Sequence, residues 1–167
     1  MTRGGIANTR DVQIPGVLAD ITESILGLQT VDEARPMTVT THSPVQFPTI
    51  YAASRLPAAG NTVVGIITEG NMAQTIADLH QFESLNGLPT LNPTVINVGG
   101  ASGDTSGTEE WDLDSQDIQG MAGGQVAGMT FYTAAALTDA ALTTTYNRVV
   151  SDNLAKVINV SDRKSVV

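Results

Sequence analysis

Two carboxylic acids lie four residues apart in the stretch TEEWDLDSQDIQG, which covers residues 108 to 120. The spacing of its apolar residues predicts one amphipathic helix, and residues four apart lie on the same face of a helix. Glu110 and Asp114 are therefore neighbours on that face. Like charges at this spacing destabilise a helix, and burying ionised carboxylates without partners costs more still. We expect the two acids to share a proton or to bind a specific partner.

The opposite side of this predicted helix is polar. The helical wheel places four residues on the arc away from the acid pair, namely Asp112, Ser115, Gln116 and Gln119. If that arc is the solvent face, the Glu110 and Asp114 side chains face inward or into a cleft. The alternative is that the helix begins here, where Glu109 and Glu110 would simply complement the positive end of the helix dipole.

The sequence contains no other group of residues with the spacing of a catalytic or cofactor-binding motif. The glycine-rich stretch at 99 to 107 lacks the GK[ST] ending of a P-loop and the GxGxxG spacing, so we expect a flexible connection. His42 and His80 have no partner at metal-ligand spacing. A GxSxG nucleophile elbow is also absent. Glu110 and Asp114 are the candidate catalytic residues, and we expect no cofactor or metal in this chain.

The composition excludes several classes of partner. The 167 residues include 17 acidic and 8 basic side chains, and this excess of negative charge argues against binding nucleic acid. No apolar run approaches the ~20 residues that cross a membrane. The absence of cysteine rules out disulfides and thiolate metal sites. The amino terminus, MTRGGIANTR, is not a signal peptide, so for an exported protein we expect that signal upstream of this sequence.

Alternating strands and helices are predicted to position the acid pair. Strands that are apolar on both faces indicate a parallel sheet covered by helices on both sides, an α/β fold. In such sheets, catalytic groups gather outside the carboxyl ends of the strands, and the loop at 99 to 107 delivers Glu110 to that edge. The predicted strands are 61–68, 93–100, 128–134 and 155–161, and the predicted helices are 47–54, 72–87, 109–124 and 137–153.

Four stretches, in this order and spacing, resemble the start of the catalytic domain of the sedolisin family of serine-carboxyl peptidases, of the pseudomonalisin and xanthomonalisin type. They are FPTIYAAS, NTVVGIITEGNMAQTIADLHQF, EEWDLDSQDIQG and VVSDNLAKVINVS. The most specific match is the Glu-x-x-x-Asp pair within the third stretch. The resemblance implies a subtilisin-like fold, incomplete here. It also implies that Glu110 is the general base for a serine nucleophile and that Asp114 supports it.

The resemblance also predicts a division of the chain into segments. Residues 1–31 resemble the end of the family's propeptide, 32–46 read as an activation linker without apolar periodicity, and 47–161 match the amino-terminal part of the catalytic domain. The partners implied are protein or peptide substrates and the protein's own propeptide. A secreted location and a calcium site are implied for the complete enzyme.

The chain departs from the family pattern at its carboxyl end. Where the family continues into a substrate-binding segment, this sequence turns to an atypical tail at 162–167. The family's later motifs, an oxyanion aspartate in Ser-Gly-Asp and a nucleophile in Gly-Thr-Ser, are missing. We therefore expect a fragment that is inactive alone. Two alternatives stay open at this point, a non-catalytic α/β module that binds a ligand and a remnant that pairs with a complementary fragment.

Overall fold

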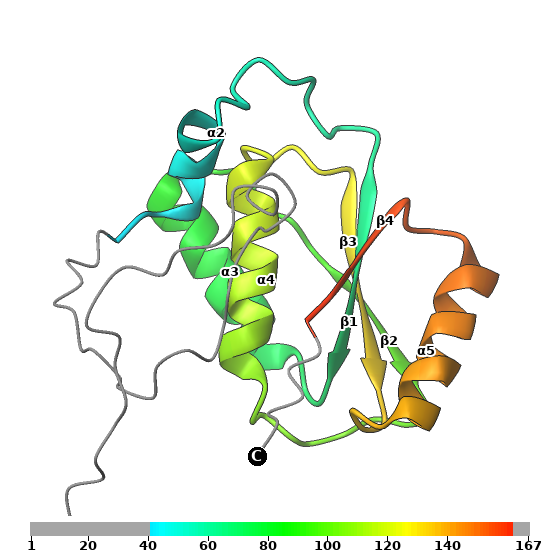
Figure 1. Cartoon of the computed structure of the whole chain (residues 1–167). Helices are drawn as coiled ribbons and strands as arrows, with labels where there is room; N and C mark the ends of the chain where they lie inside the picture. Colours follow the sequence, from blue (N-terminus) through cyan, green and yellow to red (C-terminus); the bar gives the residue numbers. More distant parts are fainter. Residues whose placement is uncertain (1–40, 162–167) are drawn as a thin grey trace, which may run out of the picture. The chain divides into compact units, whose positions relative to one another are not determined.

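The computed structural model describes residues 41–161 and contains a four-stranded, fully parallel sheet (Figure 1). The spatial order of the strands is β2-β3-β1-β4. Their bounds are Val63–Glu69 for β1, Thr94–Val98 for β2, Gly128–Ala134 for β3 and Val157–Val160 for β4. The predicted α/β class is confirmed. The predicted propeptide segment, 1–31, most of the linker and the tail at 162–167 lie outside the described residues.

Helices cover both faces of the sheet (Figure 1). The helices α3 and α4 pack on one face, and α5 packs on the other. The bounds are Ala73–Asn86 for α3, Thr108–Met121 for α4 and Asp139–Asp152 for α5. Two short elements precede β1, a 3-10 helix η1 at Pro44–Gln46 and a single turn α2 at Phe47–Ile50.

The alternation of side chains along the strands gives the sheet two apolar faces. Ile66 of β1 lies in the cluster under α3 and α4, whereas the next residue, Ile67, lies in the cluster under α5. Neighbouring residues of a strand point to opposite faces, so a strand buried on both sides reads as a continuous apolar run. The register pairs Ile66 with Phe131 and Ile67 with Tyr132, which extends both clusters across the sheet.

The helices end where the sequence supplies a residue that tolerates a left-handed backbone. Gly87 follows α3 with φ of 64°, and Asn153 follows α5 with φ of 46°. Glycine and asparagine are the residues that adopt this conformation most readily at a helix end. Thr138 caps the amino end of α5, and its side chain accepts a hydrogen bond from the Ala141 backbone N–H.

The carboxyl end of the predicted linker is folded. Residues Pro44–Gln46 form η1, which packs against α4 beside Gly120. A Cβ atom at Gly120 would lie 2.5 Å from the Cβ of Pro44, so only glycine allows this approach. Sequence periodicity cannot reveal a contact of this kind, because it depends on one small residue far along the chain.

No helix among residues 41–161 has both the length and the apolar character needed to cross a membrane.

Candidate active site

The amino-terminal end of α4 is tied to the carboxyl end of β1. The Trp111 indole N–H donates to the backbone carbonyl of Glu69 at 3.0 Å. In the loop before α4, the carbonyl of Asp104 accepts a hydrogen bond of 2.7 Å from the Asn71 backbone N–H. The glycine-rich loop at 99–107, which the sequence predicts to be flexible, is therefore bound near its middle to the residues after β1. These contacts set the first turns of α4 against the strand ends, the edge where catalytic groups collect in parallel sheets.

Asp114 is held at the end of a second strand. Ser161, the residue directly after β4, donates its hydroxyl to Oδ1 of Asp114 at 2.8 Å. The other carboxyl oxygen, Oδ2, is shielded from water and has no hydrogen-bond partner within the described part of the chain. An ionised carboxylate is costly in such a place.

The surroundings of Asp114 favour its protonated form. Burial raises the pKa of the Asp114 carboxyl above its usual range, and the charge of Glu110 raises the pKa further. Hydrogen bonds from the side chains of Ser161 and Asn159 act in the opposite direction. Asp117, one turn later on α4, also has a raised pKa, because of burial and then the charge of Asp114. Three acids thus follow one another along this side of the helix.

Glu110 lies in the first turn of α4, half-buried, one turn before Asp114. Within residues 41–161 no hydrogen bond joins the two carboxyl groups, and their interaction is electrostatic. Glu109, its neighbour, is exposed. The helix-start explanation is supported, because Glu109 and Glu110 lie in the first turn of α4. The acid-pair explanation is supported as well, because the charge of Glu110 raises the pKa of the half-buried Asp114.

The prediction that the polar arc of α4 faces solvent is wrong. Ser115 and Gln119 are both 0% exposed, Asp112 and Gln116 are half-buried, and Leu113 is 55% exposed. Polar side chains can be buried where they find hydrogen-bond partners. Gln119 donates its amide to Oε1 of Glu83 at 2.7 Å, and this contact joins α4 to α3. Asp114 instead lies on the flank of α4 that contacts the residue after β4, and Glu110 lies one helical turn before it.

Asp112 also points toward α3. Burial raises the pKa of its carboxyl, and the nearby Asp78 of α3 raises it further. The helical wheel could not anticipate this, because it gives the positions of side chains around one helix and not the location of the neighbouring helix.

Glu83 is a buried acid that the sequence pattern did not single out. It is 0% exposed, and its two carboxyl oxygens accept hydrogen bonds from the Leu91 backbone N–H at 3.0 and 3.2 Å. Thr75, Leu79 and Glu83 follow one another at intervals of four, and all three are fully buried. That periodicity was the available signal that Glu83 lies on the inner face of α3.

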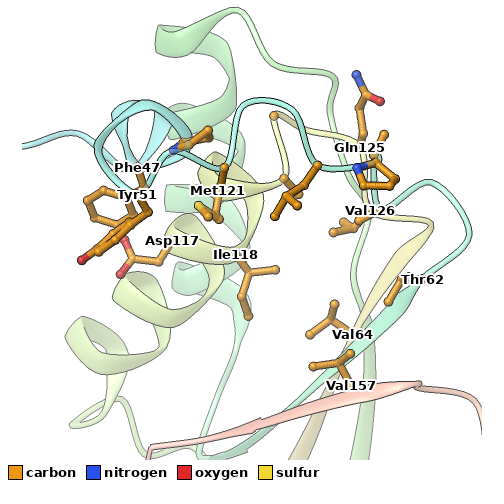
Figure 2. Close-up of a pocket in the computed structure, with 18 of the residues that line it drawn as sticks. Phe47, Tyr51, Thr62, Val64, Asp117, Ile118, Met121, Gln125, Val126 and Val157 are labelled. Atoms are coloured by element: carbon orange, nitrogen blue, oxygen red, sulfur yellow. The ribbon is translucent and has the colours of Figure 1, made fainter.

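An apolar cavity of about 800 Å³ lies beside the acid cluster (Figure 2). Ile118 and Met121 of α4, Phe47 and Tyr51 near α2, and Val157 of β4 contribute to its wall. Asp117 also reaches the cavity, whereas Glu110 and Asp114 do not line it. Thr62 and Val126, which precede β1 and β3, place the cavity toward the amino ends of the strands. Asn159 of β4 also lines the cavity, which therefore extends along β4 as far as the residue that contacts Ser161.

Within the described range, no cluster of three or more histidine, aspartate or glutamate side chains could hold a metal ion. The calcium implied for the complete family enzyme therefore has no matching donor set in residues 41–161.

Comparisons with known proteins give one consistent relationship. The chain is 47% identical to sedolisin from Pseudomonas sp. (strain 101) over 180 residues, covering 95% of this chain and 31% of that protein. It is 41% identical to xanthomonalisin from Xanthomonas sp. (strain T-22) over 186 residues, covering 93% of this chain and 22% of that protein. No family model matches the chain.

A solved structure supports the same relationship. Pseudomonas sedolisin, a serine-carboxyl proteinase complexed with two molecules of pseudo-iodotyrostatin, matches with a TM-score of 0.70 and 51% sequence identity. The match covers 75% of this chain and 36% of the solved chain. The likeness therefore holds in sequence and in fold, over a part of each relative. Over most of its length, this chain is a homologue of the sedolisin-type serine-carboxyl peptidases.

Proposed function

We propose that this chain contributes the acid pair of a serine-carboxyl endopeptidase, with Glu110 as the general base and Asp114 as its supporting acid. The observation that carries the proposal is the setting of Asp114. It lies one helical turn from Glu110, is half-buried, and accepts a hydrogen bond from Ser161 at the carboxyl end of β4. A carboxyl group held in this way can keep a proton and stabilise the charge on its neighbour.

The proposed reaction is hydrolysis of a peptide bond through an acyl-enzyme. Glu110 takes the proton from a serine hydroxyl as the serine oxygen attacks the peptide carbonyl, and the proton then passes to the leaving amine. Water releases the acyl group in the same manner. Glutamate suits acidic conditions, because its unperturbed pKa of about 4.3 leaves it partly ionised where histidine is already protonated.

The activity belongs to the whole protein rather than to this chain. The chain spans 31% and 22% of the two curated relatives, and it contains no Gly-Thr-Ser motif of the kind the resemblance predicts for the nucleophile. We propose that the complete enzyme acts on proteins or peptides outside the cell. Residues 1–31 would then belong to its propeptide, and cleavage would occur in the linker at 32–46. Calcium is proposed for the complete enzyme alone.

The test is an enzyme rebuilt by joining residues 1–161 to the remaining portion of a close relative. Glu110→Gln keeps the shape of the side chain but removes the proton acceptor, so kcat falls by ~10² or more, with little change in KM. Asp114→Asn lowers kcat less, because it alters the support of the base rather than the base. Turnover of a denatured protein substrate at acidic pH provides the measurement.

The matched control is Glu109→Gln, which makes the same chemical change at an exposed position on the same helix. It should leave kcat unchanged. Equal losses in Glu109→Gln and Glu110→Gln would show that charge at the helix start, and not a general base, explains the effect. The isolated 167-residue chain should cleave nothing at any pH, and turnover that persists through repurification would contradict the assignment.

A further inference from the structure

Two polar residues at the end of β4 hold the carboxyl group of Asp114 in place. Ser161 donates to Oδ1 of Asp114 at 2.8 Å, and the Asn159 amide donates to the Ser161 hydroxyl oxygen at 3.5 Å. Asn159 is the third residue of β4, and Ser161 follows the strand directly. The two side chains point from the same side of the strand, because residues two apart in a strand share a face. The end of β4 therefore supplies a chain of two hydrogen bonds, from Asn159 to Ser161 and from Ser161 to Oδ1 of Asp114.

The two oxygens of Asp114 have unequal surroundings. Oδ1 has a neutral hydroxyl donor, whereas Oδ2 is shielded from water and lacks a partner. A proton on a carboxyl group resides more favourably on the oxygen that does not already accept a hydrogen bond. The arrangement consequently distinguishes the two oxygens before any substrate is present.

We propose that Ser161, held by Asn159, is a positioning residue that fixes Oδ1 of Asp114 and thereby assigns Oδ2 as the oxygen that carries the Asp114 proton while Glu110 is ionised. One proton and one negative charge are distributed over the two carboxyl groups, so no other reactant is needed. When Glu110 is ionised, Asp114 holds the proton. When Glu110 accepts a proton from the nucleophile, the supporting proton stays on Oδ2. The inference rests on the proposed roles of Glu110 and Asp114, and it adds the residues that orient them.

The charges around Asp114 agree with this assignment. On its own helix, Asp114 faces Glu110 and Asp117, which are both acids. From β4 it faces Ser161 and Asn159, which are neutral. Burial and Glu110 favour the protonated form of Asp114, and the two neutral donors oppose them. Removing the Ser161 hydroxyl should therefore raise the pKa of Asp114 further.

The test uses the full 167-residue chain and a nearly isosteric pair of variants, Ser161→Thr and Ser161→Val. Threonine retains the hydroxyl, and valine replaces it with a methyl group of similar shape. The carboxyl carbon of Asp114, labelled with ¹³C and assigned with the help of Asp114→Asn, is followed by NMR between neutral and acidic pH. We expect the titration midpoint of Asp114 to rise in Ser161→Val and to stay near the wild-type position in Ser161→Thr.

The control is Ser151→Ala, at an exposed serine on α5, which should leave the Asp114 midpoint unchanged. Equal midpoints in Ser161→Thr and Ser161→Val would overturn the proposal, because a purely structural role does not depend on the hydroxyl. Should the valine variant not fold, Ser161→Ala takes its place in the same comparison with threonine.

A second readout separates this inference from the proposed function. In the rebuilt enzyme, Ser161→Val should lower kcat about tenfold, the effect of losing one hydrogen bond to an ionisable group. Ser161→Thr should restore most of it. If Glu110→Gln is fully active, the proposed function fails whatever the Asp114 midpoint does. If Glu110→Gln is inactive but Ser161→Val shifts neither kcat nor the midpoint, only the positioning role fails.

Discussion

Glu83 shows how one buried acid can join two helices without a cationic partner. Its carboxyl oxygens accept from the Leu91 backbone N–H and from the amide of Gln119. Hydrogen bonds to a buried carboxylate replace the water that it loses. Such a group is therefore stabilised only while all of its hydrogen-bond donors are in place. The contact determines which side of α4 faces α3, and so it determines where the acid pair on the same helix must lie.

Replacing Glu83 should therefore destabilise the whole domain. We expect Glu83→Ala to lower the free energy of unfolding by about 2–4 kcal/mol, because it opens a cavity, leaves the Leu91 N–H without its acceptor and leaves the Gln119 amide with the Pro89 carbonyl alone. Urea denaturation followed by circular dichroism measures the change. Glu109→Ala, at an exposed position of α4, should change the stability by less than about 0.5 kcal/mol. Similar losses in the two variants would contradict this account of Glu83.

The raised pKa values of Asp112 and Asp114 predict that acid stabilises the fold. A carboxyl group whose pKa is higher in the folded state than in the unfolded state binds its proton more tightly when folded. Its contribution to stability is therefore gained as pH falls through the folded pKa, and it is lost as pH rises. The window lies between the raised values and the ordinary aspartate value of about 3.9. For both groups, burial is the largest cause of the shift.

We expect the free energy of unfolding to increase as the pH is lowered from 7 into that window. Asp112→Asn and Asp114→Asn should each make the profile flatter and raise the stability at neutral pH, because a neutral amide carries no cost of burying charge. Urea denaturation at a series of pH values provides the profile. A steady loss of stability on acidification in the wild-type chain, unchanged by either variant, would refute this prediction.

Helix α4 depends on two close approaches at its ends. Near its carboxyl end, Gly120 meets Pro44, and before its amino end the carbonyl of Asp104 lies against Gly70. A Cβ at Gly70 would come within 2.3 Å of that carbonyl oxygen, and the φ of Gly70 is +90°. Both positions exclude a side chain for steric reasons, and together they fix the helix that carries the acid pair.

Gly120→Ala tests the approach at the carboxyl end. Alanine favours a helix over glycine, so propensity alone predicts a gain in stability. We expect a loss of about 1–3 kcal/mol instead, because the new methyl group overlaps Pro44 and must displace η1. Gly103→Ala is the control, since nothing lies within 4 Å of its Cβ position and its backbone is not left-handed. Thermal unfolding of the two variants distinguishes the outcomes, and a more stable Gly120→Ala would disprove the close contact.

Sequence patterns predicted the elements more closely than their contacts. The strand expected at 128–134 matches β3, and the helix expected at 72–87 differs from α3 by one residue at each end. Apolar runs and left-handed stops such as Gly87 are local signals. The buried side of α4 could not be predicted from local signals, because the burial of Gln119 depends on the hydrogen bond from its amide to Glu83 on another helix. The contact between Ser161 and Asp114 joins residues 47 positions apart, and no spacing rule reaches that far.

At the scale of the whole chain, the segment boundaries predicted from sequence stay a prediction. The linker at 32–46 was inferred from its prolines, its threonines and its lack of apolar periodicity. Its last three residues form η1 against α4, so cleavage near Pro44 would require that contact to open. We therefore narrow the expected site of first cleavage to 32–43.

Limited proteolysis at acidic pH tests that boundary. Mass spectrometry should identify early products that begin between residues 33 and 44, and the β1 strand should stay intact. Buried strands resist proteases, because cleavage requires several residues to leave the fold. The variant Gly120→Ala, which should loosen η1, is expected to extend the cleaved region past Pro44. Early cuts within 62–68 would show that the sheet is not protected as described.

The indole of Trp111 gives this protein an optical signal that originates at the site itself. It is the single tryptophan of the sequence, is 3% exposed, and follows Glu110 directly. Its hydrogen bond to the Glu69 carbonyl links its surroundings to the contact between α4 and β1. Tryptophan fluorescence therefore reports on the acid-bearing helix without any label. A shift of the emission to longer wavelength, at a pH where the circular dichroism is unchanged, would reveal α4 leaving the sheet before the rest of the fold opens.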